Sequence, residues 1–255
     1  MGVSMATAKH WVERWEQQQQ HYAIDREERF TVIADVVECV TAGRAGPLLL
    51  DLGCGPGSLA ARLAERLPDA EIVAVDMDPL LLELGRTHHA GAARFVDAVI
   101  GDDGWTEALE LDRPLDAAVS TTALHYLPES TLLATYRRLA ALLSPGGALI
   151  NGDHFPQGGP PCSDLTAQVG RRRAERSRIH LHEDWRSWWV AAAEDPELAD
   201  LFTQRERRRA ARGSGSDGGG LTAARHTELL RQAGFRHVTP VWQFGDSHVL
   251  VAVKD

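Results

Sequence analysis

The chain has 255 residues, of which 44% are hydrophobic and 25% are charged. This composition is typical of a globular protein and argues against a disordered, collagen-like or repeat protein. Lys and Arg together number 27 and Asp and Glu number 36, which gives a formal net charge of −9. A surface with that balance repels a phosphate backbone, so we expect no nucleic-acid partner. No apolar run approaches the roughly 20 residues that a membrane span needs, and we expect no membrane partner.

The cysteines and the N-terminal segment indicate a compartment. Cys39, Cys54 and Cys162 are odd in number and contain no CxxC pair, which argues against a disulfide framework or a cysteine-built zinc site. Residues 11–20 have neither the basic region nor the apolar region of a signal peptide. We therefore expect a cytoplasmic protein. The sequence leaves open whether it is a monomer or a homodimer.

Alternating strand and helix patterns begin at Leu48. The apolar run that starts there breaks into a glycine-rich turn, residues 58–67 carry apolar side chains at helical spacing, and the apolar run 71–76 ends on an acid. Two strands joined through a helix are parallel with a right-handed crossover. Further along, the patterns predict strands at 93–100, 116–120 and 148–152, helices at 79–88 and 130–143 (with Ser130 as its cap), and a turn at 144–147.

The end of the chain returns to this alternation. A helix is predicted at 221–233, followed by strands at 238–244 and 249–253. The connection Gly245-Asp-Ser is so short that these two strands must be antiparallel. We therefore predict an α/β fold whose open sheet is mostly parallel, with one antiparallel edge strand from the C-terminal hairpin.

Residues 153–220 interrupt the alternation. They contain no convincing strand pattern, three helical stretches near 163–178, 182–193 and 196–212, and a glycine-rich end at 213–220. This segment is predicted to be a helical insertion after the fifth strand.

The motif Asp51-Leu-Gly-Cys-Gly-Pro-Gly57 lies at a strand-to-helix turn, where glycines let the backbone approach a ligand closely. A dinucleotide-binding turn is one interpretation, because it has glycines at the same place. Two details oppose it. The third glycine of that fingerprint would fall at Ser58, and the charge of Asp51 would repel a pyrophosphate. A cationic ligand with an amino group and a sulfonium suits this acid better.

Together with three other features, this motif resembles the class I S-adenosylmethionine-dependent methyltransferase family. Asp76 ends the second strand, Gly101-Asp102-Asp103 follows the third, and the last strand is reversed. The resemblance extends from Leu48 to the C-terminal hairpin. It implies a Rossmann-like sheet, with a helical cover at 1–45, a cofactor-binding core at 46–152, a helical lid at 153–220 and a return of the core at 221–255.

The resemblance also implies a cofactor, S-adenosyl-L-methionine, with S-adenosyl-L-homocysteine as its product. Asp76 can accept both ribose hydroxyls, Met77 suits one face of the adenine ring, and Asp102 can accept from the adenine amino group. Arg29 is predicted to meet the methionine carboxylate. The full predicted set for the cofactor is Arg29, Asp51, Gly53, Cys54, Gly55, Gly57, Asp76, Met77, Gly101, Asp102, Asp103, Trp105, Ser120 and Thr121.

Two histidines are candidates for proton transfer, His125 in the segment after the fourth strand and His154 at the end of the fifth. A histidine titrates near neutral pH and suits a general base. For His125, the alternative is a residue that positions the cofactor or packs. Asp153 could orient one of these imidazoles or be a simple turn residue.

Aromatic residues are the candidates for the methyl acceptor's site: Trp15, Tyr22, Tyr126, Trp185 and Trp189. A tryptophan stripe in an amphipathic helix can equally be core. We expect no metal, since His180 and His182 fit surface residues better than ligands. The arginine clusters 171–173 and 207–209 are interpreted as solvated helix faces, because the insertion is locally neutral.

The sequence therefore predicts an enzyme that transfers a methyl group to an oxygen or nitrogen, less readily a carbon, of a small metabolite, with a place in secondary metabolism as one option. Three alternatives stay open: cyclisation or another use of the same cofactor without methylation, a non-catalytic cofactor-binding regulator, and a dinucleotide-dependent oxidoreductase.

Overall fold

The structure is a computed structural model that describes residues 2–156, 159, 161–178, 183–212 and 220–255. The strands are β1 (Leu48–Leu52), β2 (Glu71–Asp76), β3 (Arg94–Asp97), β4 (Leu115–Thr121), β5 (Leu143–His154), β6 (His237–Phe244) and β7 (Ser247–Val253). The α-helices are α1 (Met5–Gln19), α2 (Arg26–Thr41), α3 (Ser58–Arg66), α4 (Pro79–His88), α5 (Glu129–Leu142), α6 (Cys162–Arg176), α7 (Trp185–Ala193), α8 (Ala199–Arg212) and α9 (Ala223–Gln232). Short 3₁₀ turns are η1 (Glu107–Leu109), η2 (Leu124–Tyr126) and η4 (Pro196–Leu198).

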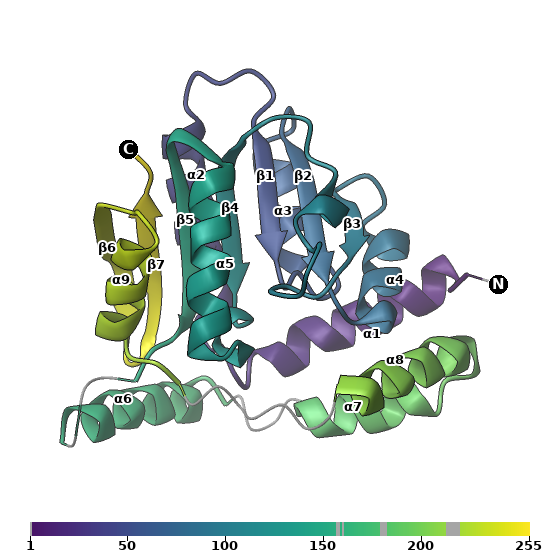
Figure 1. Cartoon of the computed structure of the whole chain (residues 1–255). Coiled ribbons are helices and arrows are strands. Elements are labelled where there is room, and N and C mark those ends of the chain that lie inside the picture. The colour runs from purple at the N-terminus through teal and green to yellow at the C-terminus, as the bar shows by residue number, and fades with distance from the viewer. Residues whose placement is uncertain (1, 157–158, 160, 179–182, 213–219) are drawn as a thin grey trace.

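The strands form one sheet of order β3-β2-β1-β4-β5-β7-β6 within the described residues (Figure 1). Neighbours from β3 to β5 are parallel, and β7 is antiparallel to both β5 and β6. This confirms the predicted fold class, a mostly parallel sheet with a reversed C-terminal strand.

The reversed strand does not lie at the edge, so that detail of the prediction is wrong. All but the last residue of β7 are buried, whereas β6 is largely exposed and contains Pro240. A proline cannot donate to a sheet ladder and is tolerated at an edge. The apolar β7 therefore pairs on both sides, and β6 takes the edge.

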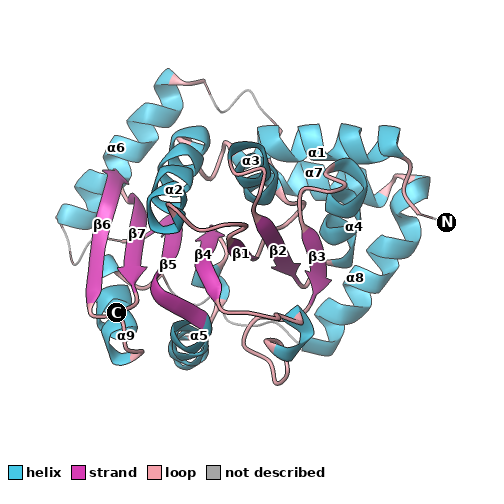
Figure 2. Ribbon diagram, turned by 90° about the horizontal axis from the view of Figure 1, so that it is seen from above, coloured by secondary structure: helices cyan, strands magenta, loops and turns pink. Residues whose placement is uncertain are grey.

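Each face of the sheet packs on its own set of helices (Figure 2). In β1, Leu48, Leu50 and Leu52 belong to the cluster that includes α5 and α9, and Leu49 belongs to the cluster that includes α2 and α3. Successive side chains of a strand point to opposite faces. Because helices cover both faces, the central strands β1 and β2 are apolar at nearly every position.

Three predicted boundaries are corrected by local hydrogen bonding. β3 ends at Asp97 rather than 100, because the chain turns where the Asp102 N–H donates to the Val99 carbonyl. α5 begins at Glu129 after Pro128, without a side-chain cap from Ser130. Residues 144–147 lie within β5 instead of forming a turn, and Gly146 and Gly147 pair with Lys254 near the chain end.

The described residues of the insertion form three α-helices, as predicted, and these lie at the end of the sheet to which the β1 and β2 arrows point (Figure 1). α6 lies beside the β6–β7 turn, where a Cβ on Gly245 would come 3.0 Å from the Thr166 carbonyl. α7 and α8 lie beside α1 and α4. Among the described helices, none has the length and apolar character required to cross a bilayer.

The glycine turn after β1 generates a stability test. Gly53 has φ +69°, and a Cβ there would lie 2.3 Å from the Ala123 Cβ, whereas Gly43 has φ +78° with open space around it. Gly43→Ala should lower the unfolding free energy by about 1–2 kcal/mol, because the only penalty is the strain of alanine in a left-handed backbone conformation. Gly53→Ala should cost roughly 1–3 kcal/mol more through overpacking. Urea denaturation of both variants measures the difference, and an equal loss of unfolding free energy in the two variants would contradict the close approach of Gly53 to Ala123.

Candidate functional site

The glycine turn folds over the end of β2. The N–H groups of Gly53 and Cys54 both donate to the Val75 carbonyl, at 2.8 and 3.1 Å. Gly53, Gly55 and Gly57 all have positive φ, between +55° and +84°, a conformation that favours glycine. A Cβ on Gly57 would lie 2.7 Å from the Phe95 ring. The turn therefore requires glycine for both its backbone and its packing.

Asp76 links this turn to the next helix. Its carboxylate accepts from the Gly55 N–H at 2.8 Å and from the Asp78 N–H at 2.9 Å. Burial raises the pKa of Asp76 to about 6, although these hydrogen bonds favour the charged form. Asp78, not Asp76, caps α4, because its Oδ1 accepts from the N–H groups of Leu80 and Leu81. The carboxylate of Asp76 thus retains lone pairs for further donors.

Asp51 is a buried carboxylate in β1. It is 1% exposed, and neither oxygen has a hydrogen-bond partner of ordinary geometry among the described residues. Burial raises the pKa of Asp51 to about 7, partly offset by the Ala60 backbone N–H and increased by the charge of Asp76. An unpartnered buried acid is costly to ionise and would be stabilised by a cation.

Trp15 of α1 covers the glycine turn. A Cβ on Gly55 would lie 3.6 Å from its ring, and Trp15 is 9% exposed. Its ring packs edge-on against Trp188 and Trp189 of α7, with centroids 5.1 and 6.3 Å apart. Trp188 and Trp189 of the stripe are therefore core between α1 and α7, and the predicted contact of Trp15 and Trp189 with an acceptor stays a prediction.

The end of β4 is held tightly. The Ser120 hydroxyl donates to the Leu52 carbonyl at 2.9 Å, and the Thr121 hydroxyl faces Arg29 at 3.5 Å. The next residue, Thr122, has φ +50°, a strained conformation for a β-branched residue. Such strain tends to occur at functional sites, where surrounding contacts hold it in place.

His125 forms a pair with Asp153. Its Nδ1 lies 2.9 and 3.0 Å from the two carboxylate oxygens of Asp153, which is fully buried. Burial alone would raise the pKa of Asp153. The hydrogen bond and charge of His125, the His154 N–H and the nearby Arg29 charge together hold the pKa of Asp153 below its ordinary value. An ionised Asp153 only accepts, so the neutral His125 carries its proton on Nδ1 and its lone pair on Nε2.

His154 lies on the other face of β5. Its Nε2 is 3.3 Å from Nη2 of Arg29, and its Nδ1 is 3.3 Å from an oxygen of Asp246. A guanidinium only donates, so Nε2 must accept and Nδ1 must donate. The lone pair of His154 is therefore engaged by Arg29. The strand's alternation separates the two predicted proton acceptors.

Arg29 is 1% exposed and ties α2 to three strands. It donates to the Gly152 carbonyl at 3.3 Å and to the Ser247 hydroxyl, and it contacts Thr121 and His154. Burial lowers the pKa of Arg29 to about 10, so it stays charged at neutral pH. Its predicted contact with a methionine carboxylate stays a prediction.

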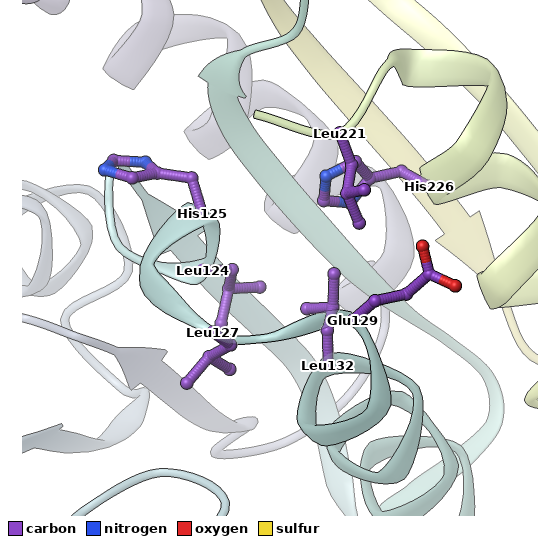
Figure 3. A pocket seen from close by; sticks show the side chains of 7 residues that line it. All are labelled: Leu124, His125, Leu127, Glu129, Leu132, Leu221 and His226. Atoms are coloured by element: carbon purple, nitrogen blue, oxygen red, sulfur yellow. The ribbon is translucent and has the colours of Figure 1, made fainter. Parts of the chain in front are cut away.

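A cavity of about 140 Å³ opens on the α5 and α9 side of the sheet (Figure 3). Four leucines line it, together with His125, Glu129 and His226. The Nδ1 of His226 lies 2.7 Å from the Tyr136 hydroxyl, and burial lowers the pKa of His226 to about 4, so this imidazole is neutral. The cavity was not predicted, because its leucines come from η2, α5 and the segment before α9 and share no local pattern.

The remaining predicted residues are distributed around this region. Asp102 and Asp103 are exposed, and Trp105 is buried among core residues of α5 and β4. A Cβ on Gly101 would lie 2.3 Å from Thr131, which brings the segment after β3 against α5. The exposed aromatic residues are Tyr22, Tyr126 and Trp185, with 49%, 64% and 38% of their surface accessible.

The arginine clusters are only partly solvated, which corrects the prediction. Arg173 pairs with the mostly buried Asp25 at 2.8 Å, and Arg208 pairs with Asp97 at 2.6 Å. Arg205, which the sequence patterns did not single out, is 6% exposed and pairs with Asp78 at 2.6 Å. A usable signal was present, because positions 198, 201, 205 and 208 have helical spacing and begin with leucines.

No group of three potential metal ligands occurs among the residues that the structure describes. His180 and His182, which have a spacing seen in metal sites, lie outside the described residues.

Comparison with known proteins relates part of this chain to methyltransferases. Residues 49–147 match the family model described as a methyltransferase domain. A trans-aconitate 2-methyltransferase from Methylobacterium radiotolerans is 38% identical over 102 residues, which cover 40% of this chain and 36% of that protein. Another from Methylobacterium nodulans is 29% identical over 178 residues, which cover 65% of this chain and 64% of that protein. The chain thus spans between about a third and two thirds of these relatives.

A solved structure has the same fold. The crystal structure of magnesium protoporphyrin IX methyltransferase from Synechocystis PCC 6803 with bound SAH matches with a TM-score of 0.58. The match covers 96% of this chain and 94% of that chain, at 15% identity. The predicted resemblance to the class I methyltransferase family is confirmed by the matched segment and by the fold.

Asp51 generates a pH prediction. Its folded pKa of about 7 exceeds the ordinary aspartate value near 4. The neutral form therefore stabilises the fold below pH 4, and this contribution is lost as pH rises to about 7. In Asp51→Asn, the contribution should not change with pH. The unfolding free energy of the variant, relative to the parent, should rise by on the order of 3 kcal/mol between pH 4 and pH 7.5.

Urea unfolding of both proteins at several pH values in this range measures the difference. Asp76 is present in both proteins, so its titration enters the difference only through its charge coupling to Asp51. Parallel pH profiles of the two proteins would contradict the raised pKa of Asp51.

Proposed function

We propose that this protein uses S-adenosyl-L-methionine to methylate an oxygen or a nitrogen of a small molecule. The observation that carries the proposal is the pair of acids at the glycine turn, the buried Asp51, which has no hydrogen-bond partner of ordinary geometry among the described residues, and the half-buried Asp76 at the end of β2. The methyltransferase-domain match over residues 49–147 supports it.

The residues of the turn fit this cofactor. The unpartnered carboxylate of Asp51 suits a cationic amino group, and the lone pairs of Asp76 suit two ribose hydroxyls. Met77, next along the chain, offers an apolar side chain to the adenine ring. Asp102 and Asp103 follow β3, where an acid would meet the adenine amino group. When bound, the cofactor supplies a methyl group on a positively charged sulfur.

His125 is the proposed general base. Asp153 fixes the imidazole with its lone pair on Nε2, and a neutral imidazole can take the proton of an acceptor hydroxyl or ammonium. His154 is the less suitable base because Arg29 already engages its Nε2. Alignment of the nucleophile with the methyl group, with water excluded once the ligands are bound, is the proposed main contribution to the rate.

The cavity beside His125 is the proposed place for an apolar part of the acceptor. In another protein, an engineered cavity of about 150 Å³ with an apolar lining binds benzene, which sets the scale for volumes of this order. A volume of about 140 Å³ with four leucines and a neutral His226 therefore suits one ring or a short branched chain. Two relatives are named for trans-aconitate, and Glu129 at this cavity has its charge offset by a pair with Arg225 at 2.5 Å.

Calorimetric titration with S-adenosylmethionine and with a nicotinamide dinucleotide tests the cofactor class. Binding of the first alone is expected, and binding of the dinucleotide alone would favour an oxidoreductase. Turnover to S-adenosylhomocysteine is then measured with phenols, short aliphatic amines and trans-aconitate. Cofactor binding without turnover would favour a regulator, and product formation without S-adenosylhomocysteine would favour a cyclising enzyme.

Asp76→Ala tests the ribose contact. Each charge-assisted hydrogen bond contributes about 1.5–3 kcal/mol, so the affinity for S-adenosylmethionine should fall at least roughly tenfold. Asp69→Ala, in the exposed loop before β2, is the matched control and should bind as the parent does. Unchanged binding by a folded Asp76→Ala variant would remove Asp76 from the cofactor site.

Paired histidine variants test the base. His125→Gln should lower single-turnover methyl transfer by on the order of 10²–10⁴-fold at saturating cofactor, with S-adenosylhomocysteine affinity little changed. His154→Gln should lower the rate much less, because its lone pair is engaged by Arg29. Rates are followed from pH 5.5 to 9. A His125→Gln rate within a few-fold of the parent, with a large loss in His154→Gln, would reverse the assignment.

A further inference from the structure

The helices α7 and α8 pack against α1 and α4, at the end of the sheet to which the β1 and β2 arrows point. Their apolar residues form one cluster with α1 and α4, and this cluster includes Trp11, Trp15, Leu81 and Trp188. The indole N–H of Trp188 donates to the Trp11 carbonyl at 3.3 Å. This part of the insertion is therefore packed against both α1 and α4, the helix that follows β2.

Arg205 of α8 reaches the segment between β2 and α4. Its Nε donates to Oδ2 of Asp78 at 2.6 Å, and both side chains are mostly buried. Its guanidinium lies 3.5 Å from the centroid of the Trp189 ring, which fixes its plane. Asp78 uses its other oxygen to cap α4 and donates its N–H to Asp76. Arg205 thus fixes the side chain of Asp78, whose backbone N–H in turn donates to the carboxylate of Asp76.

Arg208, one turn later in α8, also contacts the segment between β2 and α4. Its Nη1 donates to the Met77 carbonyl at 3.0 Å, and its two terminal nitrogens meet the two oxygens of Asp97 at 2.6 and 2.7 Å. Asp97 ends β3, so the guanidinium bridges the ends of two neighbouring strands. A bidentate pair of this kind restricts geometry more than a point charge would.

We propose that Arg205 and Arg208 are positioning residues that hold Asp76, Met77 and Asp78 in the conformation that binds the adenosine half of the cofactor. This inference rests on the proposed function. The contacts lie on the side chain of Asp78 and on the backbone of Met77, so they leave the Asp76 carboxylate for the ribose. The α7–α8 part of the insertion then controls cofactor affinity, whereas the cavity beside His125 lies on the α5 and α9 side.

The test uses Arg205→Met and Arg208→Met in the full chain, with Arg209→Met as a matched control from the exposed side of α8. Calorimetry measures the dissociation constants of S-adenosylhomocysteine and of 5′-methylthioadenosine, which lacks the amino-acid half. Both constants should rise about tenfold in each variant and stay within twofold in the control. Arg205→Lys should recover part of the affinity, because it retains the charge facing Asp78.

A double-mutant cycle separates positioning from general destabilisation. If Arg205 acts through Asp76, then Arg205→Met should weaken binding less than threefold in the Asp76→Ala background. A full tenfold effect in that background, or unchanged binding in folded single variants, would overturn the inference. Failure of the parent to bind either ligand would instead overturn the proposed function.

Discussion

The proposed chemistry depends on how this fold keeps Asp153 ionised without access to water. A buried carboxylate is costly to charge, and here the imidazole of His125, the backbone N–H of His154 and the nearby Arg29 offset that cost. The ionised acid sets the tautomer of His125. Asp51 is the opposite case, because burial outweighs its single favourable backbone contact and raises its pKa to about 7. The carboxylate of Asp153 is therefore held in its charged form, whereas a nearby cation would favour ionisation of Asp51.

The alternation of β5 distributes these groups. Gly152 and His154 face α2, where Arg29 fills the space that a larger side chain than glycine would need. Asp153 faces the other side and meets His125. Two histidines that look equivalent in sequence therefore have different hydrogen-bond partners. The cavity beside His125 lies on the side of the sheet that carries α5 and α9, apart from the α7–α8 contacts with the β2–α4 segment.

The strands of the mostly parallel sheet and the glycine turn could be predicted because local patterns encode them. Apolar runs mark β1 and β2, and Gly53 and Gly57 mark a backbone that other residues avoid. The edge position of β6 required weighing its exposed residues and Pro240 against the apolar β7. For Asp153 the sequence suggested an imidazole partner but not which histidine, and the structure selects His125. The partners of Arg205 and Arg208 could not be predicted, because each contact joins elements far apart in sequence. A charged residue in an amphipathic helix looks solvated until its partner strand is placed.

The tryptophan cluster has a consequence for how the chain reaches this structure. Trp11 and Trp15 pack against Trp188 and Trp189, so these aromatic partners of α1 lie more than 170 residues away. Contacts of such high sequence separation carry a large loop-closure entropy and form late in folding. The parallel strands can pair before Trp188 and Trp189 of α7 have packed against α1. During synthesis, the cover over the glycine turn would therefore be completed only after α7 has emerged, and until then an apolar helix face near the N-terminus would be exposed to solvent and to chaperones.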